Sequence, residues 1–421
     1  MPKDLILLPI TSTGNSEYRL QHLTGQMRGE SQVVQLPPLV CFCHLRWNFV
    51  YQRPQHLISQ WGSLNDVHFF EEPHFVKADS ATLTISENAK GVRVITPTLP
   101  RGLSEQEVIE AQRLLLDDYL HKESLTSFVA WYYTPMALRF SAHLSPLAVV
   151  YDCMDELSAF QGAPPEMVQQ EQQLFQIADV VFAGGNSLYE SKRLQHPNVH
   201  LFPSSIDKAH FSASRQALPD PIDQQRIPRP RIGFYGVLDE RLDQELMKNL
   251  AALRPDWHFI FLGPVVKIRE EDLPRSANLH YLGAKSYTEL PQYLANWDVA
   301  ILPFAQNAST RFISPTKTPE YLAGGKPVVS TPIQDVVQPY GEMGFVHIAA
   351  TPEEFADAVE RSLEPKHPDH DRRVDKFLAE MSWSKTFNGM LKEIQKCGAG
   401  SAVSSVLTGP PGKERGTVAN V

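Results

Sequence analysis

The sequence predicts an α/β protein of two Rossmann-like, doubly wound parallel-sheet domains that face each other across a cleft. Apolar segments of strand length alternate with amphipathic helical segments along most of the chain, as is typical of parallel sheets covered by helices. A proline-rich segment without apolar periodicity, residues 216–230, divides the alternation into two series. The length of 421 residues and the hydrophobic content of 42% suit two cores of about 200 residues each.

The first series, residues 38–215, alternates from its first apolar segment onward. Its predicted strands are LVCFCHL, DVHFFEE, VRVITPT, SFVAWYY, LAVVYDC, DVVFAG and VHLFPSS. Its predicted helices are Arg53–Trp61, Ser104–Leu120, Pro165–Ile177 and one that begins at Asn186.

The second series, residues 231–374, repeats the pattern. Its predicted strands are RIGFYGV, WHFIFLG, LHYLGA, VAILPFA, KPVVSTP and FVHIAA. Its predicted helices are Gln244–Leu253, one after LHYLGA, one initiated at Ser314, and Thr351–Leu363. Open α/β sheets bind ligands at the carboxyl ends of their strands, so the loops after these strands are where we look for a site.

Three segments lie outside the two series. Residues 1–37 form an irregular polar extension, and residues 398–421, rich in Gly, Ser and Pro, are expected to be a disordered tail. Residues 375–397 predict a terminal helix with an apolar stripe formed by Trp383, Phe387, Met390, Leu391 and Ile394. The stripe needs a partner surface, so we expect this helix to pack back on the first domain. We expect residues 216–230 to be the linker that lets the cleft close.

Charge and cysteine content exclude some classes of partner. With 39 Lys and Arg against 48 Asp and Glu, the net charge is −9 and the pI is about 5.9, and no basic run offers a footprint for nucleic acid. The four cysteines form no CxxC pair, which fits a reducing cytoplasm. No segment approaches the roughly 18 apolar residues of a membrane span. We expect a cytoplasmic protein, with peripheral contact at the inner face of the plasma membrane left open.

The segment Phe304–Thr331 predicts a ligand site between two strands. Ser314 suits the N-cap of a helix, Pro315 suits its first position, and Thr316 and Lys317 follow with backbone donors. A helix N-terminus beside a lysine favours an anion, and Glu320, about a turn further on, can accept hydrogen bonds from a sugar diol. Phosphate beside ribose indicates a nucleotide. The alternative is an ordinary helix start with Gly324 and Gly325 as its C-cap.

A second phosphate-type turn lies in Arg231–Asp243. Gly236 permits close approach of the backbone to a ligand, and Arg241 occupies the crevice between strand and helix, where its guanidinium can grip a diphosphate. The alternative for Arg241 is an ion pair with Asp239, Glu240 or Asp243.

Two Rossmann-like halves with phosphate-binding features in the second resemble the GT-B fold of sugar-nucleotide transferases. The chain is similar to bacterial family-4-type glycosyltransferases over about residues 38–395. The similarity rests on the blocks HLRWNFVYQRPQHL, YDCMDELSAF, GFYGVLDERLD, FLGPVVKI and TRFISPTKTPEYLAGGKPVVSTP. One position departs from the family, which has two glutamates eight residues apart at the donor site. Glu320 matches the second, but Phe312 stands at the first, so the contacts to the transferred sugar must come from elsewhere.

This resemblance implies a nucleotide-sugar donor, with a UDP-sugar expected and a GDP-sugar as the alternative, and no further cofactor or metal. The implied donor residues are Gly236, Arg241, Gly263, Ser314, Pro315, Thr316, Lys317 and Glu320. Arg241 and Lys317 would carry the charge of the departing diphosphate. Asp369 and Asp371 resemble an Asp-x-Asp metal motif, but they lie in a hydrophilic stretch before a helix, and we interpret them as solvated charges. The resemblance also implies retention of configuration, although an aspartate base would suit inversion equally.

Acceptor groups are expected at the strand ends of the first domain. Asp155 is the preferred catalytic group, either accepting the proton of the acceptor hydroxyl or orienting that hydroxyl. The other candidates are His44, Arg46, Arg53, Asp152 and Glu156. Structural alternatives exist: Asp155 as a cap, Arg46 paired with Glu71 or Glu72, and His44 as a core histidine.

The function indicated is transfer of a sugar to a glycan or lipid-linked acceptor in cell-envelope polysaccharide biosynthesis. The alternatives are a non-catalytic GT-B-like protein that binds nucleotides or glycans, which the departure at Phe312 favours, and a sugar-nucleotide epimerase.

Overall fold

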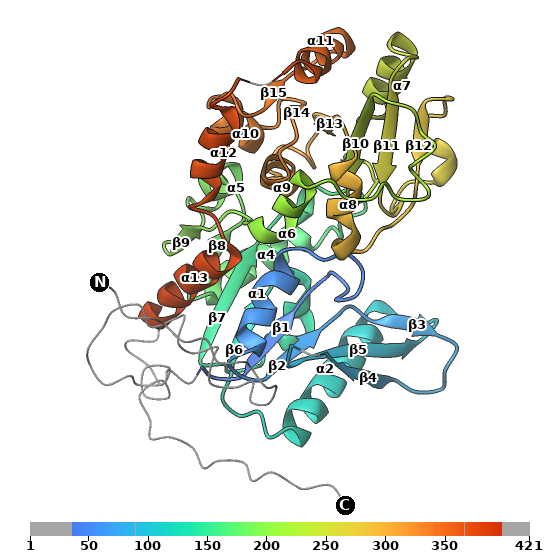
Figure 1. The fold of residues 1–421 in the computed structure, drawn as a ribbon. Helices are drawn as coiled ribbons and strands as arrows, with labels where there is room; N and C mark the ends of the chain where they lie inside the picture. Colours follow the sequence, from blue (N-terminus) through green and yellow to red (C-terminus); the bar gives the residue numbers. More distant parts are fainter. Residues whose placement is uncertain (1–35, 89, 366, 398–421) are drawn as a thin grey trace, which may run out of the picture. The chain divides into compact units, whose positions relative to one another are not determined.

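The computed structural model describes residues 36–88, 90–365 and 367–397, and Figure 1 shows their arrangement in two sheets with helices. The predicted N-terminal extension, except for its last two residues, and the predicted tail lie outside the described residues. The described residues belong to one compact unit.

The first sheet has the strand order β3-β5-β2-β1-β6-β7-β8-β9, with β4 paired to β5. Its strands are β1 (Leu39–Phe42), β2 (Val67–Phe70), β3 (His74–Val76), β4 (Thr82–Glu87), β5 (Val92–Pro100), β6 (Val129–Tyr132), β7 (Ala148–Cys153), β8 (Val180–Ala183) and β9 (Val199–Leu201). All pairings are parallel except that of β4 with β5. Two strands, β3 and β4, were not predicted from the sequence, and they form the exposed edge of this sheet.

Helices cover both faces of the first sheet. They are α1 (Arg53–Gly62), α2 (Glu105–Lys122), α3 (Leu138–Ser141), α4 (Met167–Ile177) and α5 (Asn186–Lys192). One core lies between the sheet and α1, and a second lies between the opposite face and α2, α3 and α4. A capping box begins α2: the Ser104 hydroxyl accepts from the Glu107 N–H at 3.4 Å, and the Glu107 carboxylate accepts from the Ser104 N–H at 2.7 Å.

The second sheet is wholly parallel, with the order β12-β11-β10-β13-β14-β15. Its strands are β10 (Arg231–Tyr235), β11 (His258–Leu262), β12 (Leu279–Tyr281), β13 (Val299–Leu302), β14 (Val328–Ser330) and β15 (His347–Ile348). Its helices are α6 (Lys208–Ser212), α7 (Gln244–Leu253), α8 (Leu290–Ala295), α9 (Lys317–Ala323), α10 (Gln334–Val336), α11 (Pro352–Leu363) and α12 (His370–Leu378).

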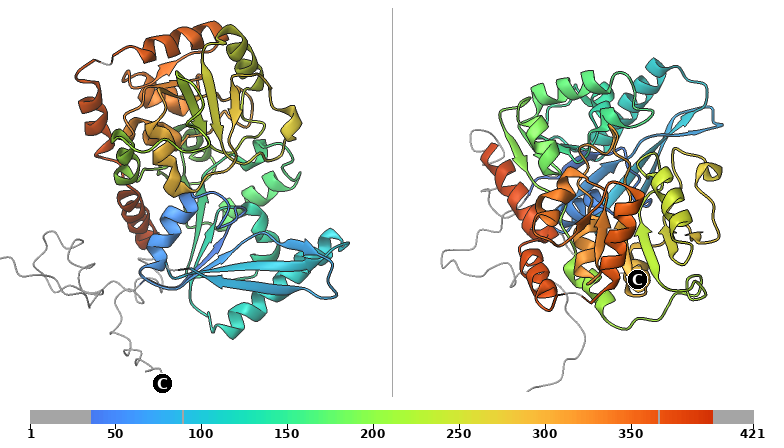
Figure 2. Two further views of the ribbon diagram at one scale, coloured as in Figure 1. Left: turned by 45° about the vertical axis from the view of Figure 1, so that its right-hand side comes forward. Right: turned by 90° about the horizontal axis from the view of Figure 1, so that it is seen from above.

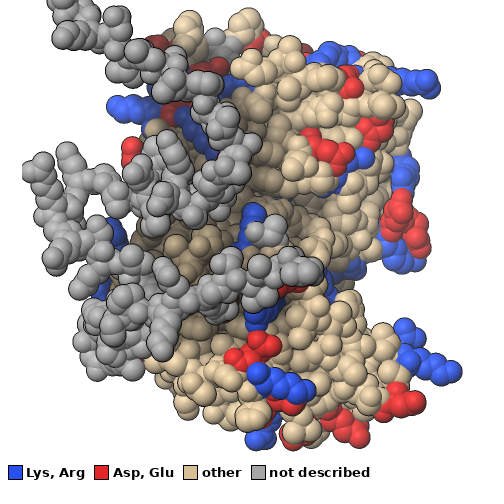
Figure 3. All heavy atoms as spheres, turned by 60° about the horizontal axis from the view of Figure 1, so that its bottom comes forward, with Lys and Arg blue, Asp and Glu red and all other residues tan. Residues whose placement is uncertain are grey.

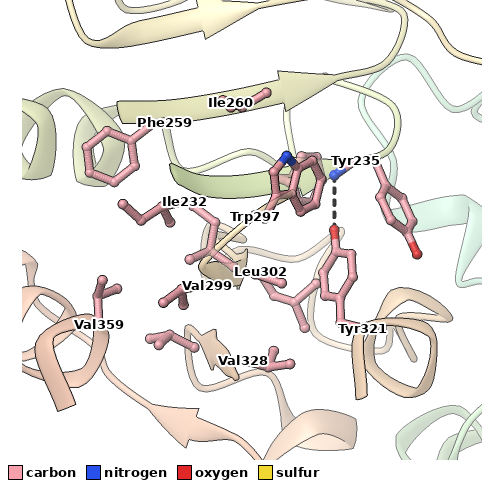
Figure 4. Packing of buried hydrophobic residues seen from close by; sticks show 14 of the residues in the cluster. Ile232, Tyr235, Phe259, Ile260, Trp297, Val299, Leu302, Tyr321, Val328 and Val359 are labelled. Carbon is pink, nitrogen blue, oxygen red and sulfur yellow. Dashed lines mark hydrogen bonds between the residues drawn. The ribbon is translucent and has the colours of Figure 1, made fainter. Parts of the chain in front are cut away.

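Aromatic packing fixes α9 against the second sheet (Figure 4). The Tyr321 hydroxyl accepts a hydrogen bond of 3.0 Å from the backbone N–H of Tyr235, so the helix is joined to the end of β10. Trp297 packs over β10 at Gly233, where a Cβ atom would lie 2.0 Å from its ring. The loops that follow β10 and precede α9 are therefore held by one rigid core.

The predicted linker differs from the structure. Ile206, Phe211 and Ile227 belong to the hydrophobic core of the second sheet, and the Gln224 side chain accepts a hydrogen bond of 2.8 Å from the Trp297 indole. Residues 206–230 therefore pack as part of the second half. The polar and proline-rich composition of 216–230 suggested exposure, but Pro221, Gln224 and Ile227 are buried.

The predicted terminal helix is two helices. Leu378 ends α12 within the second core, and α13 (Trp383–Cys397) begins after Ser382, whose hydroxyl caps it by accepting from the Lys385 N–H at 3.1 Å. The apolar side of α13 joins the core of the first sheet and contacts α1, β7 and β8 (Figure 2). The chain thus returns to the first half, as expected for the apolar stripe.

The described surface is mixed in charge. On the face drawn in Figure 3, Lys and Arg lie among Asp and Glu rather than in one broad patch. None of the helices described is both long and apolar enough to cross a membrane. Within 36–88, 90–365 and 367–397, no cluster of three or more His, Cys, Asp or Glu side chains could hold a metal ion.

Candidate active site

A cavity is formed where loops of the two halves meet. It is lined by Val50, Gln52, Arg53, Met154, Asp155, Ser204, Gly236, Val237, Arg241, Phe304, Ile313, Ser314, Pro315, Thr316 and Lys317. The loop after β7 brings Asp155, the loop after β10 brings Gly236 and Arg241, and the segment before α9 brings Ser314 to Lys317. The structure therefore unites the predicted phosphate residues with the predicted catalytic aspartate.

Two glycines allow the turns after β10 and β11 to touch. Gly236 has φ +150° and Gly263 has φ +148°, and a Cβ atom on Gly263 would lie 1.8 Å from the carbonyl oxygen of Gly236. A Cβ atom on Gly236 would lie 2.3 Å from Cε of Lys317. Only glycine leaves room for the second turn and for the lysine side chain at this point.

Lys317 and Glu320 lie one turn apart on α9, and their charges interact. Burial lowers the pKa of Lys317, although Glu320 opposes that effect. Burial raises the pKa of Glu320 to about 7, although the Tyr235 hydroxyl and the charge of Lys317 act to lower it. Oε2 of Glu320 accepts a hydrogen bond of 2.7 Å from the Tyr235 hydroxyl, and no described residue donates to Oε1. Glu320 lies behind the cavity rather than in its lining.

Arg241 is held by its own loop. Its Nε lies 3.0 and 3.1 Å from the two carboxylate oxygens of Asp239, and its Nη2 lies 2.6 Å from Oδ2. The intraloop ion pair named as an alternative is thus present, yet Arg241 still lines the cavity. Asp239 orients the guanidinium, and no described residue accepts from Nη1.

The start of α9 differs from the prediction. The helix begins at Lys317 and Thr316 is its N-cap, with no side-chain capping bond. Ser314 does not cap the helix: its hydroxyl helps to lower the pKa of the Asp335 carboxyl, which burial raises. Pro315 still accepts a turn bond, from the Thr318 N–H at 3.1 Å. The turn after Pro315 starts the helix two residues later than the Ser-Pro signal indicated.

Asp155 is positioned as an available carboxylate. No described residue donates a hydrogen bond to its side chain, and it lines both this cavity and a neighbouring one. Burial raises the pKa of Asp155 to about 6, while Arg241 and Lys317 oppose the shift. A carboxylate whose pKa lies near neutrality and which has no fixed partner suits proton transfer or hydroxyl orientation.

The neighbouring cavity has a volume of about 580 Å³, within the range of ligand pockets. His44 and Arg46 line it, as do Asp155, Arg241 and Lys267. Burial lowers the pKa of His44 to about 4, so the ring is neutral, and its Nδ1 is buried with no partner among the described residues. Arg46 pairs with Glu71 at 3.2 Å and with backbone carbonyls, which is the structural alternative stated above.

Three acceptor-side predictions are corrected by the structure. Arg53 and Asp152 form a buried ion pair, with Nη2 to Oδ1 at 2.8 Å and the Asp152 side chain fully buried, so the aspartate cannot contact an acceptor. Arg53 also donates to the Phe202 carbonyl at 2.7 Å. Glu156 points away from both cavities and pairs with Lys192 at 2.8 Å. Asp152 and Glu156 therefore lie outside the lining of both cavities, whereas Arg53 lines the first cavity with its guanidinium held by Asp152.

Phe160 and Lys267 were missed as site residues. Phe160, from the loop after β7, lies 4.6 Å from Nζ of Lys267 and 5.3 Å from Cζ of Arg241, measured to its ring centre. These cation–π contacts join the two halves across the larger cavity. Phe160 lies in the block YDCMDELSAF and Lys267 in the block FLGPVVKI. The family resemblance of these blocks could have indicated both residues, whereas their chemistry alone could not.

A third cavity, of about 500 Å³, adjoins the turn glycines on the other side. Tyr235, Gly236 and Gly263 line it, together with Tyr51 and Tyr287 from outside the predicted site. The rings of Tyr51 and Tyr287 lie 4.9 Å apart, so aromatic side chains of both halves face this space.

Comparison with known proteins agrees with this geometry. Residues 229–365 match the family described as glycosyl transferases group 1. TuaH of Bacillus subtilis strain 168, named as a teichuronic acid biosynthesis glycosyltransferase, is 26% identical over 280 residues, covering 62% of this chain and 70% of that protein.

Solved structures share the fold at low identity. Sucrose-phosphate synthase from Thermosynechococcus elongatus matches with a TM-score of 0.64 at 14% identity, covering 87% of this chain and 100% of that one. Anabaena HepE in complex with UDP and glucose matches with a TM-score of 0.59 at 12% identity, covering 86% and 100%. A trehalose-phosphate synthase from Burkholderia xenovorans, in complex with glucose-6-phosphate, matches with a TM-score of 0.62 at 11% identity, covering 85% and 100%. The fold, the group 1 domain and the bacterial relative together support a bacterial GT-B glycosyltransferase.

Proposed function

We propose that the protein transfers a sugar from a nucleotide-sugar donor to a glycan or lipid-linked acceptor, with retention of configuration and without a metal ion. The observation that carries the proposal is the cavity in which Asp155 of the first half faces Arg241 and Lys317 of the second. The carboxylate can bind the hydroxyl of an acceptor, and the two cations that face it can bind the diphosphate of a donor.

The donor would lie along the second half. Its diphosphate would contact Lys317, Arg241 and the segment Ser314–Thr316, and its ribose would approach Oε1 of Glu320. The HepE complex contains UDP, which favours a UDP-sugar, and a starch synthase of this fold is bound to ADP and acarbose. A GDP-sugar is the alternative donor.

The departing diphosphate gains negative charge in the transition state. Lys317 packs against Gly236 and Arg241 is held by Asp239, so each would stabilise that charge by a few kcal/mol. These cations would stabilise the departing diphosphate, as a divalent metal ion does in other enzymes.

The acceptor hydroxyl would hydrogen-bond to Asp155. Its oxygen forms a bond to the anomeric carbon as the bond from that carbon to the diphosphate oxygen breaks. In a retaining reaction both events occur on one face of the sugar, so Asp155 orients the hydroxyl and the proton leaves with the diphosphate.

The test is incubation with a panel of UDP- and GDP-sugars and with water as acceptor. Slow release of nucleoside diphosphate from one donor is the expected result, and Lys317→Ala should abolish it. Interconversion of the donor sugar without release would indicate an epimerase, and the proposal would be wrong.

A further inference from the structure

An apolar cavity in the first half is left unused by the proposed reaction. It lies at the carboxyl ends of β1 and β2, between α2 and the segment that leads into α3. Its apolar lining residues are Phe42, Phe70, Pro73, Val108, Ile109, Met136, Ala137 and Phe140. Its volume is about 150 Å³. Apolar cavities of about this size hold a benzene-sized group, so a segment of roughly six carbons fits.

Two of the acidic groups in its wall, Glu71 and Glu105, are already paired. Glu71 accepts from the Trp47 N–H at 2.6 Å and from the Thr96 hydroxyl at 2.9 Å, and Glu105 pairs with Arg139 at 2.5 Å. These groups are satisfied by the protein itself, so the cavity offers a ligand mainly hydrocarbon surface. A sugar would find few free partners here, whereas an alkyl chain would lose none.

The cavity adjoins the larger cavity beside Asp155. Glu72, Thr134 and Met136 line both. Burial raises the pKa of Glu72, although the charge of Arg46 acts to lower it. No described residue donates a hydrogen bond to the Glu72 carboxyl. A ligand with its reacting hydroxyl at Asp155 therefore has a path past Glu72 into apolar surroundings.

We propose that this cavity binds the apolar aglycone of the acceptor, a hydrocarbon chain attached at the end of the acceptor sugar remote from the reacting hydroxyl. The inference rests on the proposed function and narrows its acceptor to the lipid-linked or alkyl-bearing class. Burial of each methylene group contributes enough to strengthen binding by about fourfold.

The experiment measures binding of alkyl β-D-glucosides and alkyl β-D-galactosides to the UDP-saturated full-length protein by calorimetry. Affinity should rise from the methyl to the hexyl glycoside by roughly 10²-fold or more and level off at octyl, when the cavity is filled. Equal affinity along both series, or no binding of any member, would overturn the proposal.

Two variants on α2 separate the cavity from general hydrophobicity. Ile109→Trp fills the cavity and should remove the dependence on chain length. Leu114→Trp adds the same bulk at a position on the same helix that is 60% exposed and outside the cavity, and it should keep the dependence. If Ile109→Trp does not fold, Val108→Thr provides a variant of unchanged volume that should weaken the effect. Persistence of the full effect in Ile109→Trp would overturn the proposal.

Release of nucleoside diphosphate with water as acceptor provides an independent readout. Ile109→Trp should leave it unchanged, because this cavity shares no lining residue with the cavity that contains both Arg241 and Lys317. Absence of the chain-length effect in the unmodified protein, with its donor hydrolysis intact, refutes only the aglycone site. Absence of hydrolysis from every sugar nucleotide in the unmodified protein refutes the proposed function.

Discussion

Replacing Asp155 with Asn should lower activity and raise stability at the same time. The carboxyl has a pKa of about 6 in the folded protein against 3.8 ordinarily, a difference that corresponds to about 3 kcal/mol. Because the folded pKa is raised, protonation of Asp155 stabilises the fold, fully below pH 3.8, and this contribution is lost as the pH rises through 6. Between pH 4.5 and pH 8 the change amounts to about 2 kcal/mol, or about 1 kcal/mol after allowance for solvent in the cleft.

The assay is thermal unfolding of the Asp155→Asn variant and the unmodified protein at pH 4.5 and pH 8. The variant lacks the titration, so its stability relative to the unmodified protein should be higher at pH 8 than at pH 4.5 by a degree or more in the midpoint. A difference that does not change with pH would refute the reasoning, since it would mean that the Asp155 carboxyl titrates normally.

The turnover of the Asp155→Asn variant should fall while its stability rises. We expect kcat to fall by roughly 10²-fold with nearly unchanged affinity for the nucleotide, and the acid limb of the pH profile near pH 6 to disappear. Glu156→Gln is the matched control, because Glu156 is the adjacent carboxylate but pairs with Lys192 outside the cavity. Full turnover by Asp155→Asn would remove this residue from the mechanism.

Two other substitutions and one treatment test the donor site, and two glycine substitutions test the packing of the turns. Lys317→Ala should weaken UDP binding by roughly 10- to 100-fold and leave uridine binding nearly unchanged, and equal losses would argue against a phosphate contact. Glu320→Gln should raise the donor KM, with a smaller effect on a 2′-deoxyribose donor; identical effects on both donors would argue against a diol contact. Gly263→Ala should destabilise the protein by about 3 kcal/mol or more in denaturation measurements, whereas Gly283→Ala, with φ +71° and open space around it, should cost about 1–2 kcal/mol. Activity should survive EDTA, and loss that Mg²⁺ or Mn²⁺ restores would contradict the metal-free mechanism.

Local patterns predicted the alternation of strands and helices because each buried strand and amphipathic helix carries its own periodicity. They could not predict β4, since nearly all of its residues are exposed and no apolar face marks it. Gly236, Arg241 and Lys317 were predictable because strand-end chemistry is local. The pairing of Arg53 with Asp152 was not, because these residues are 99 positions apart and each taken alone looks like a ligand group. Burial of the ion pair, which only the fold reveals, decides between the two roles.

The return of α13 to the first half has a mechanical consequence. The chain passes between the halves once at residues 203–205, between Phe202 in one core and Ile206 in the other, and again at Ser382, between Met381 and Trp383. Two bodies joined by a single chain crossing can rotate about several axes. Two crossings leave one easy rotation, about the line that runs through both of them. Opening of the active site should therefore follow a single arc, along which Asp155 returns to the same position opposite Lys317 at each closure.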